Sequence, residues 1–113
     1  YLRLGANQIS DLAPLSGLTK LILLNLRSNQ INDISPLSGL TNVTTLYLHQ
    51  NRISDISPLA GLINLRELDL RSNPMNAEAY DVYIPLIRAN NPRILIAYRA
   101  DQLDYLFGRP RGD

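Results

Sequence analysis

A 22-residue period across the first two thirds of the chain constrains its fold more than any other feature. Each copy holds a leucine, a second leucine two positions later and an asparagine three positions after that. Columns of aspartate, proline and glycine recur at the same spacing, and most positions of 24–42 are unchanged in 46–64. So many columns in phase indicate one unit that stacks on copies of itself. The asparagines that mark the copies are Asn7, Asn29, Asn51 and Asn73.

The leucine pair of each copy predicts a short β-strand. In Leu24-Asn25-Leu26 apolar and variable residues alternate, which buries one face of an extended chain. Strands that recur in one direction stack as a parallel ladder about 4.8 Å apart, with rows of leucine and isoleucine inside. The asparagine lies where the chain leaves the strand, and its amide can bond backbone groups that the turn leaves unpaired. We therefore predict an α/β solenoid with an all-parallel sheet.

The segment that returns the chain to the next strand is predicted to contain only short turns or 3-10 pieces. In 33–42 a proline and a glycine stand too close together for a long α-helix. Asp11, Asp33 and Asp55 would stack in neighbouring copies, as in a carboxylate ladder for a cation. Each stands at the start of a turn, however, where aspartate caps local N–H groups, and hard cations need more converging oxygen ligands. We interpret this column as structural and predict no metal site and no cofactor.

The segment Val43-Thr-Thr-Leu-Tyr-Leu-His-Gln-Asn-Arg-Ile53 resembles the leucine-rich-repeat signature Leu-x-x-Leu-x-Leu-x-x-Asn-x-Ile. The repeat length, with Asp-Ile-Ser-Pro-Leu-Ser-Gly-Leu-Thr-Asn at 33–42, is similar to the short repeats of bacterial internalin-like proteins. The resemblance covers residues 1–75. It implies a right-handed curved solenoid with the sheet on its concave face, short turns on its convex face and protein binding at the concave face. It names no particular receptor. The sequence itself does not determine the compartment, and the resemblance favours secretion or the cell surface.

The pattern changes after residue 75, and the chain is predicted to divide into three parts. About three and a half repeats, without an N-terminal cap, occupy 1–75, a capping helix and strand occupy 76–97, and a tail occupies 98–113. Within 76–91, Tyr80, Tyr83, Ile84 and Ile87 follow helical spacing, and Pro85 kinks this helix or begins a second one. Residues 94–97 are predicted to form a last strand. The tail ends in Arg111-Gly112-Asp113, which resembles the integrin-recognition tripeptide and which we interpret as incidental.

The variable residues beside the buried leucines are predicted to form the binding surface. Tyrosine and arginine at the centre of a rigid sheet are the residue types that dominate protein-binding sites. The prediction rests first on Tyr47, His49, Arg27 and Arg71, with Leu23 as an unusual exposed apolar neighbour. Four strands form a strip under about 20 Å wide, so the surface is expected to extend N-terminally in a parent protein. The remaining candidates are Asn25, Asp69, Glu67, Thr45 and Arg3.

Other classes of function receive less support from the sequence. His49 is the single histidine, and an open sheet offers neither water exclusion nor a nucleophile oriented by a base, so no enzyme is predicted. A net charge of +1 and the acidic Glu67 and Asp69 within the basic column argue against nucleic acid. No run approaches the roughly 20 apolar residues that span a membrane.

An assembly role through the N-terminal edge is the alternative function. Tyr1 enters in the middle of a predicted strand, so nothing in the sequence caps the apolar row of Leu2, Leu4, Ile9 and Leu12. Open edges and exposed apolar rows favour association. We expect in the first place that the chain is a fragment of a longer solenoid, and otherwise that this edge pairs with another chain or domain, a second copy of this chain included.

Overall fold

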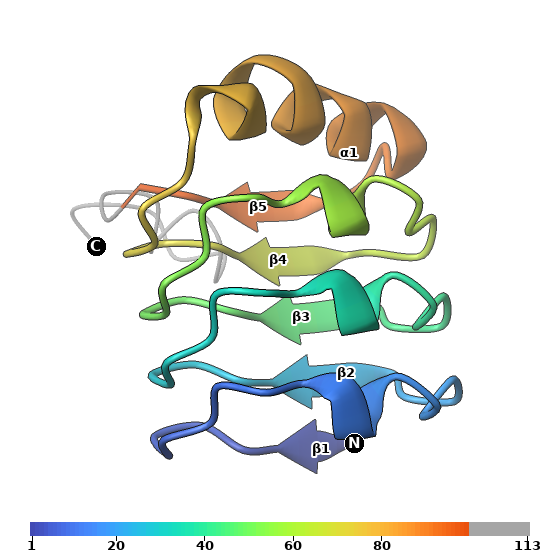
Figure 1. The fold of residues 1–113 in the computed structure, drawn as a ribbon. Coiled ribbons are helices and arrows are strands. Elements are labelled where there is room, and N and C mark those ends of the chain that lie inside the picture. Colours follow the sequence, from blue (N-terminus) through green and yellow to red (C-terminus); the bar gives the residue numbers. More distant parts are fainter. Residues whose placement is uncertain (100–113) are drawn as a thin grey trace, which may run out of the picture.

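Short parallel strands, one from each turn of the chain, form a single sheet. The computed structural model describes residues 1–99. The tripeptide Arg111-Gly112-Asp113 lies outside the described residues. Within 1–99 the sheet has five strands in the order β1-β2-β3-β4-β5 (Figure 1). Leu24 pairs with Leu46, and Leu46 pairs with Leu68, so equivalent residues of successive repeats lie side by side. The strands are β1 (Leu2–Arg3), β2 (Leu23–Asn25), β3 (Thr45–Tyr47), β4 (Glu67–Asp69) and β5 (Leu95–Ala97).

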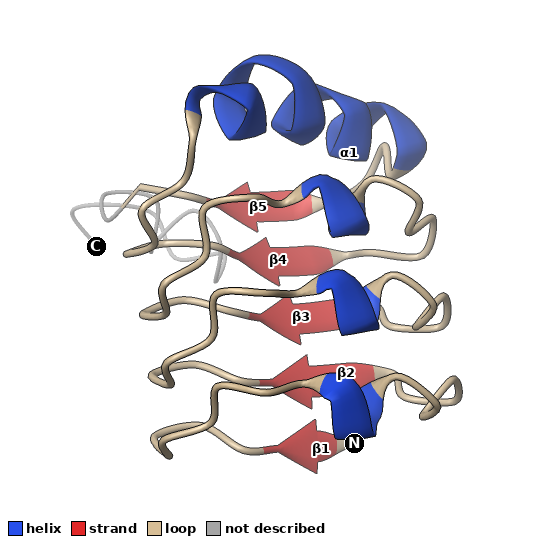
Figure 2. Cartoon of the chain, in the orientation of Figure 1, coloured by secondary structure: helices blue, strands red, loops and turns tan. Residues whose placement is uncertain are grey.

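From β1 to β4, a 3-10 turn lies between successive strands and stacks in a second layer beside the sheet (Figure 2). Each 3-10 helix has a proline near its start, and an aspartate lies just before the helix begins. The Asp33 carboxylate accepts a 2.9 Å hydrogen bond from the Ser35 N–H, and the two other aspartates make the same bond. The Ser35 N–H and hydroxyl lower the pKa of Asp33, so the column caps turns as the sequence predicted. The turns are η1 (Ala13–Leu15), η2 (Ser35–Leu37) and η3 (Ser57–Leu59).

The interior is a stack of aliphatic layers held in register by the asparagine column. Leu24, Leu46 and Leu68 are each at most 1% exposed. The Asn51 side-chain amide donates to the carbonyls of Leu48 and of Leu26 one coil earlier, and its oxygen accepts from the Ile31 N–H at 3.0 Å. The residue before each asparagine takes a positive φ, which turns the chain sharply out of the strand. The recurring leucines therefore build the core, and the recurring asparagines hold the turn that follows each strand.

The cap replaces the regular coil with a helix laid over the end of the stack (Figure 1). It begins as a π-helix, η4 (Ala79–Tyr83), and continues as α1 (Ile84–Asn90). The wide π turn lies directly before Pro85, which has no N–H to donate to the residue four positions earlier. Ala79, Ile84 and Ile87 are buried against the last layer. None of the helices within residues 1–99 has the length and apolar content needed to cross a membrane.

Candidate functional site

The outward side chains of β2–β4 and of the residues that follow them form one surface, here called the sheet face. Strand pairing places Asn25 beside Tyr47 and Tyr47 beside Asp69. A second column is formed by the first residue of each strand. A third is formed by the residue that lies two positions after the end of each strand. The predicted members of the sheet face are Leu23, Asn25, Arg27, Thr45, Tyr47, His49, Glu67, Asp69 and Arg71.

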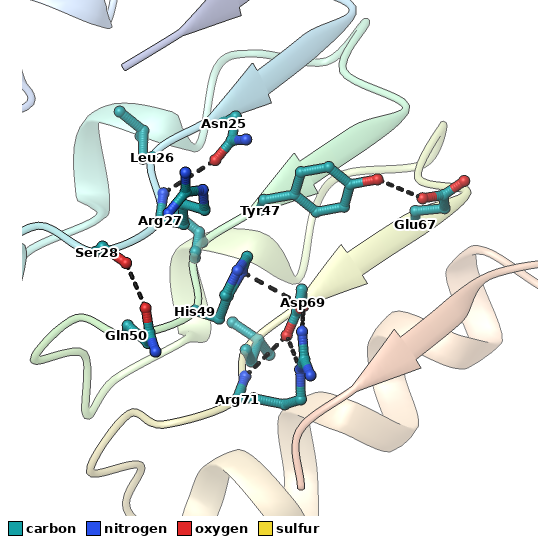
Figure 3. Close-up of polar contacts among 12 residues, drawn as sticks. Asn25, Leu26, Arg27, Ser28, Tyr47, His49, Gln50, Glu67, Asp69 and Arg71 are labelled. Atoms are coloured by element: carbon teal, nitrogen blue, oxygen red, sulfur yellow. Dashed lines mark hydrogen bonds and ion pairs between the residues drawn. The ribbon is translucent and has the colours of Figure 1, made fainter. Parts of the chain in front are cut away.

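A hydrogen bond across two strands holds the tyrosine of the sheet face. The Tyr47 hydroxyl on β3 donates to Glu67 Oε2 on β4 at 2.6 Å (Figure 3). Burial of the phenol, together with this bond to a carboxylate, raises the pKa of Tyr47 to about 12. The phenol therefore stays protonated at neutral pH and remains a hydrogen-bond donor.

A buried aspartate lies at the centre of the charged groups. The Asp69 side chain is 0% exposed, and its Oδ1 accepts from Arg71 Nε at 2.8 Å and from the Arg71 N–H at 3.1 Å. Its Oδ2 accepts from Arg71 Nη2. This two-point contact is the geometry in which arginine binds a carboxylate most strongly, and the hydrogen bond to Asp69 raises the pKa of Arg71.

The single histidine packs against both groups. His49 Nδ1 lies 3.3 Å from Asp69 Oδ2, yet it is not aligned for a hydrogen bond with any described residue. The imidazole meets the Tyr47 ring edge-on, with centroids 6.2 Å apart at 76°. Burial lowers the pKa of His49, and Arg71 and Arg27 lower it further while Asp69 opposes them. His49 is therefore mainly neutral at pH 7.

The structure gathers only part of the predicted set into this network. Arg27 instead extends over Gly5, where a Cβ would lie 2.9 Å from Arg27 Cγ. Arg3 lies on β1 with its guanidinium 5.7 Å from the Tyr1 ring centroid. Asp69 requires a correction, because it was expected at the surface and is fully buried, with its carboxylate turned onto Arg71 and His49. Leu23, Asn25 and Thr45 are half-buried.

Some residues of this surface were missed by the sequence reasoning. The Ser28 hydroxyl donates to Gln50 Oε1, which ties the turns of two coils together. A small hollow of about 180 Å³ is lined by Gln50, Ser72, His49 and Arg71. Both Ser28 and Gln50 precede a repeat asparagine, so their place in the 22-residue period is the signal that could have found them.

Leu95 on β5 is a further missed residue. It pairs with Glu67, so it continues the column of Leu23, Thr45 and Glu67 by one strand, and it is 42% exposed. The strand itself was predicted. Its register was not, because the inserted helix breaks the 22-residue spacing.

The charged side chains of the sheet face are largely paired with one another. Of the acid–base candidates, Asp69 is paired with Arg71, and His49 Nδ1 lies 3.3 Å from the same carboxylate. In the part of the chain that the structure describes, no three His, Asp or Glu side chains gather where they could hold a metal ion. The sheet face instead offers oriented donors, acceptors and an aromatic ring.

Comparisons with known proteins agree with the geometry. The family described as Leucine Rich repeats (2 copies) matches residues 1–39 and again 41–78. The crystal structure of an internalin C2 from Listeria monocytogenes superposes with a TM-score of 0.74 at 40% identity, covering 87% of this chain and 40% of that one. An internalin (inlF) from the same organism superposes with a TM-score of 0.72 at 36% identity, covering 84% of this chain and 26% of that one.

This chain therefore spans less than half the length of either internalin structure. No match is found among curated protein sequences. The family match nevertheless extends over more than half of the chain, and the structural matches share its parallel sheet and short turns. The chain belongs to the leucine-rich-repeat family and is an internalin-like member of it.

Proposed function

We propose that this chain is a non-catalytic module that recognises a protein partner through the sheet face. Leucine-rich-repeat proteins are generally protein-interaction scaffolds. The finer assignment, to the face centred on Tyr47 and His49, rests on the geometry of that face. The face extends over β4 and β5 through Glu67, Arg71 and Leu95, the last of which was not predicted from the sequence.

One observation carries this proposal, namely that the side chains of β3 and β4 hold one another in place. Tyr47 is held by Glu67, and Arg71 is held by the buried Asp69 (Figure 3). Binding usually costs about 0.5–1.5 kcal/mol for each flexible side chain that becomes ordered. A surface whose tyrosine and arginine are already oriented avoids much of that cost, and these residue types supply most binding hot spots.

The test compares the wild-type chain with the Tyr47→Ala/His49→Ala variant. A partner is first isolated on immobilised wild-type chain, and its Kd for each variant is then measured by titration calorimetry. We expect the double variant to bind at least about tenfold more weakly, since single hot-spot truncations cost about 1–2 kcal/mol or more. The matched control is Ser38→Ala, an exposed position at the end of η2, which should leave the Kd unchanged.

An unchanged Kd in a folded double variant would remove the sheet face from consideration. Assembly through the β1 edge makes a different prediction. It requires concentration-dependent oligomers in light scattering that Leu2→Glu abolishes and that the Tyr47/His49 substitutions leave intact.

A further inference from the structure

A second surface lies along the segments that precede β2 to β5, here called the strand-start edge. It is formed by residues 16–22, 38–44, 60–66 and 91–94, and its charged residues are Lys20, Arg66 and Arg93. These segments contain no aspartate or glutamate, whereas the capping aspartates stand just before the 3-10 turns. Within the part of the chain that the structure describes, the charge of these four segments is therefore entirely basic.

The strand-start edge is hollowed next to the cap. A depression of about 390 Å³ lies between the coil that precedes β4 and the turn that precedes β5. Its walls include the exposed Arg66 and Arg93, together with Asn64, Pro92 and Ile63. Ile63 is 64% exposed, so an apolar side chain stands beside the two cations. The volume is in the range of pockets that hold small ligands or a few side chains.

Buried hydrogen bonds fix the backbone on both sides of this hollow. Asn91 is 3% exposed, and its amide oxygen accepts from the Leu65 N–H at 2.8 Å while its nitrogen donates to the Leu62 carbonyl at 2.8 Å. The Arg66 N–H donates to the Thr44 carbonyl, and the Arg66 carbonyl accepts from Leu95. The backbones that carry the two arginines are therefore held in one fixed relation.

The two arginines also differ from the arginine of the sheet face. Arg71 is neutralised by Asp69, whereas neither Arg66 nor Arg93 forms an ion pair with any residue in 1–99. Guanidinium groups bind carboxylates in a planar, two-point geometry, and two of them facing one hollow favour a ligand with two negative charges. The neighbouring Ile63 and Pro92 offer an apolar contact to the same ligand.

We infer that this hollow binds an acidic segment of a partner protein, with two carboxylates on Arg66 and Arg93 and an apolar side chain on Ile63. A long polyanion would need a continuous basic track, but the edge has three cations in its described segments, and the chain has a net charge of +1. None of the residues that line this hollow belongs to the sheet face.

The experiment uses the ¹⁵N-labelled 113-residue chain and the peptide acetyl-Glu-Leu-Glu-amide as probe. We expect saturable amide shifts confined to the segments that line the hollow, 42–44, 63–66 and 91–93. The Arg66→Gln/Arg93→Gln variant should bind at least about tenfold more weakly, because two charge-assisted contacts are lost. Lys20→Gln, a cation of the same edge outside the hollow, is the matched control and should change the Kd less than twofold. The Tyr47→Ala/His49→Ala variant should bind as the wild type does, which separates this site from the sheet face.

Three results would overturn the inference. The first is equal binding of acetyl-Gln-Leu-Gln-amide, which carries no charge. The second is unchanged affinity in the folded arginine double variant. The third is that inorganic phosphate or a heparin tetrasaccharide shifts the same amides at concentrations at least about tenfold lower than the peptide, which would assign the hollow to phosphate or sulfate ligands.

Discussion

The interior and the sheet face of the same strands follow opposite rules. Inside, Leu24, Leu46 and Leu68 are identical and stacked in register. Outside, one residue further along each strand, the side chain differs in every coil. Repetition inside makes each coil interchangeable with its neighbour for folding, while variation outside gives each coil a distinct contribution to binding. The four predictions below test how completely folding and recognition are divided between these two sides.

The largest effect is expected in the interior. Leu46→Ala removes a side chain that is 1% exposed and should lower the free energy of unfolding by about 3–4 kcal/mol in urea denaturation. Because the coils are equivalent, Leu68→Ala should cost the same within about 1 kcal/mol. Leu23→Ala, on the half-buried opposite side of β2, is the control and should cost under about 1 kcal/mol. A similar loss from Leu23→Ala would mean that the two sides of the strands are not distinct in folding.

The asparagine column should show the next largest effect. Asn51→Ala removes a buried amide that serves backbone groups of two coils, and we expect a loss of about 2–3 kcal/mol in urea denaturation. Asn7 is exposed and bonds only the carbonyls of Leu4 and Gly5 in its own coil. Asn7→Ala should therefore cost under about 0.5 kcal/mol. Equal losses at the two positions would show that the bonds between coils add nothing.

The interior could be predicted from the sequence because each of its contacts occurs several times. The leucine pair, the asparagine and the aspartate each recur, so their spacing alone indicated strands, turns and caps. The cap occurs once, and its helix was predicted from apolar spacing, with Pro85 marked as a break. The π turn before Pro85 and the register of β5 were not predicted. The repeat spacing ends at the cap, and the sequence has no second copy of the cap with which to compare it.

The sheet face was predictable only in part, for a related reason. The alternation of inward and outward residues along each strand correctly indicated which side chains share a side with Tyr47. It cannot indicate which of them bond one another, and so it placed Asp69 at the surface. Pairing with Arg71 explains the difference, since a carboxylate that accepts hydrogen bonds from the Arg71 guanidinium and N–H can be buried although it is charged.

Asp69 belongs to an outward column of the strands but is buried, so a substitution there tests whether folding and recognition are divided between the two sides. The expected loss of stability is smaller than in the two predictions above. Asp69→Asn keeps the acceptor for the Arg71 N–H, as Asn25 does for the Arg27 N–H two coils earlier in the stack. It loses the charge, so we expect a loss of about 1–2 kcal/mol in stability together with a further fall in the pKa of His49. Asn25→Asp is the control and should change stability by less than about 0.5 kcal/mol. If Asp69→Asn were as harmless, the ion pair would be dispensable for the fold.

The smallest effect concerns the protonation of His49. Burial lowers the pKa of His49 below 6.5 in the folded chain, so the unfolded chain binds the proton more tightly. The contribution of the neutral imidazole to stability is therefore fully present above pH 6.5 and is lost as pH falls from there towards the folded pKa. His49 is the single histidine, so its Hε1 resonance reports this titration without ambiguity. The midpoint should lie below 6.5 in the wild type, and His49→Gln should flatten the decline of stability between about pH 6.5 and 5, where aspartates and glutamates are still mostly ionised. A midpoint at or above 6.5 would mean that Asp69 outweighs burial and that the sheet face carries a cation at its centre.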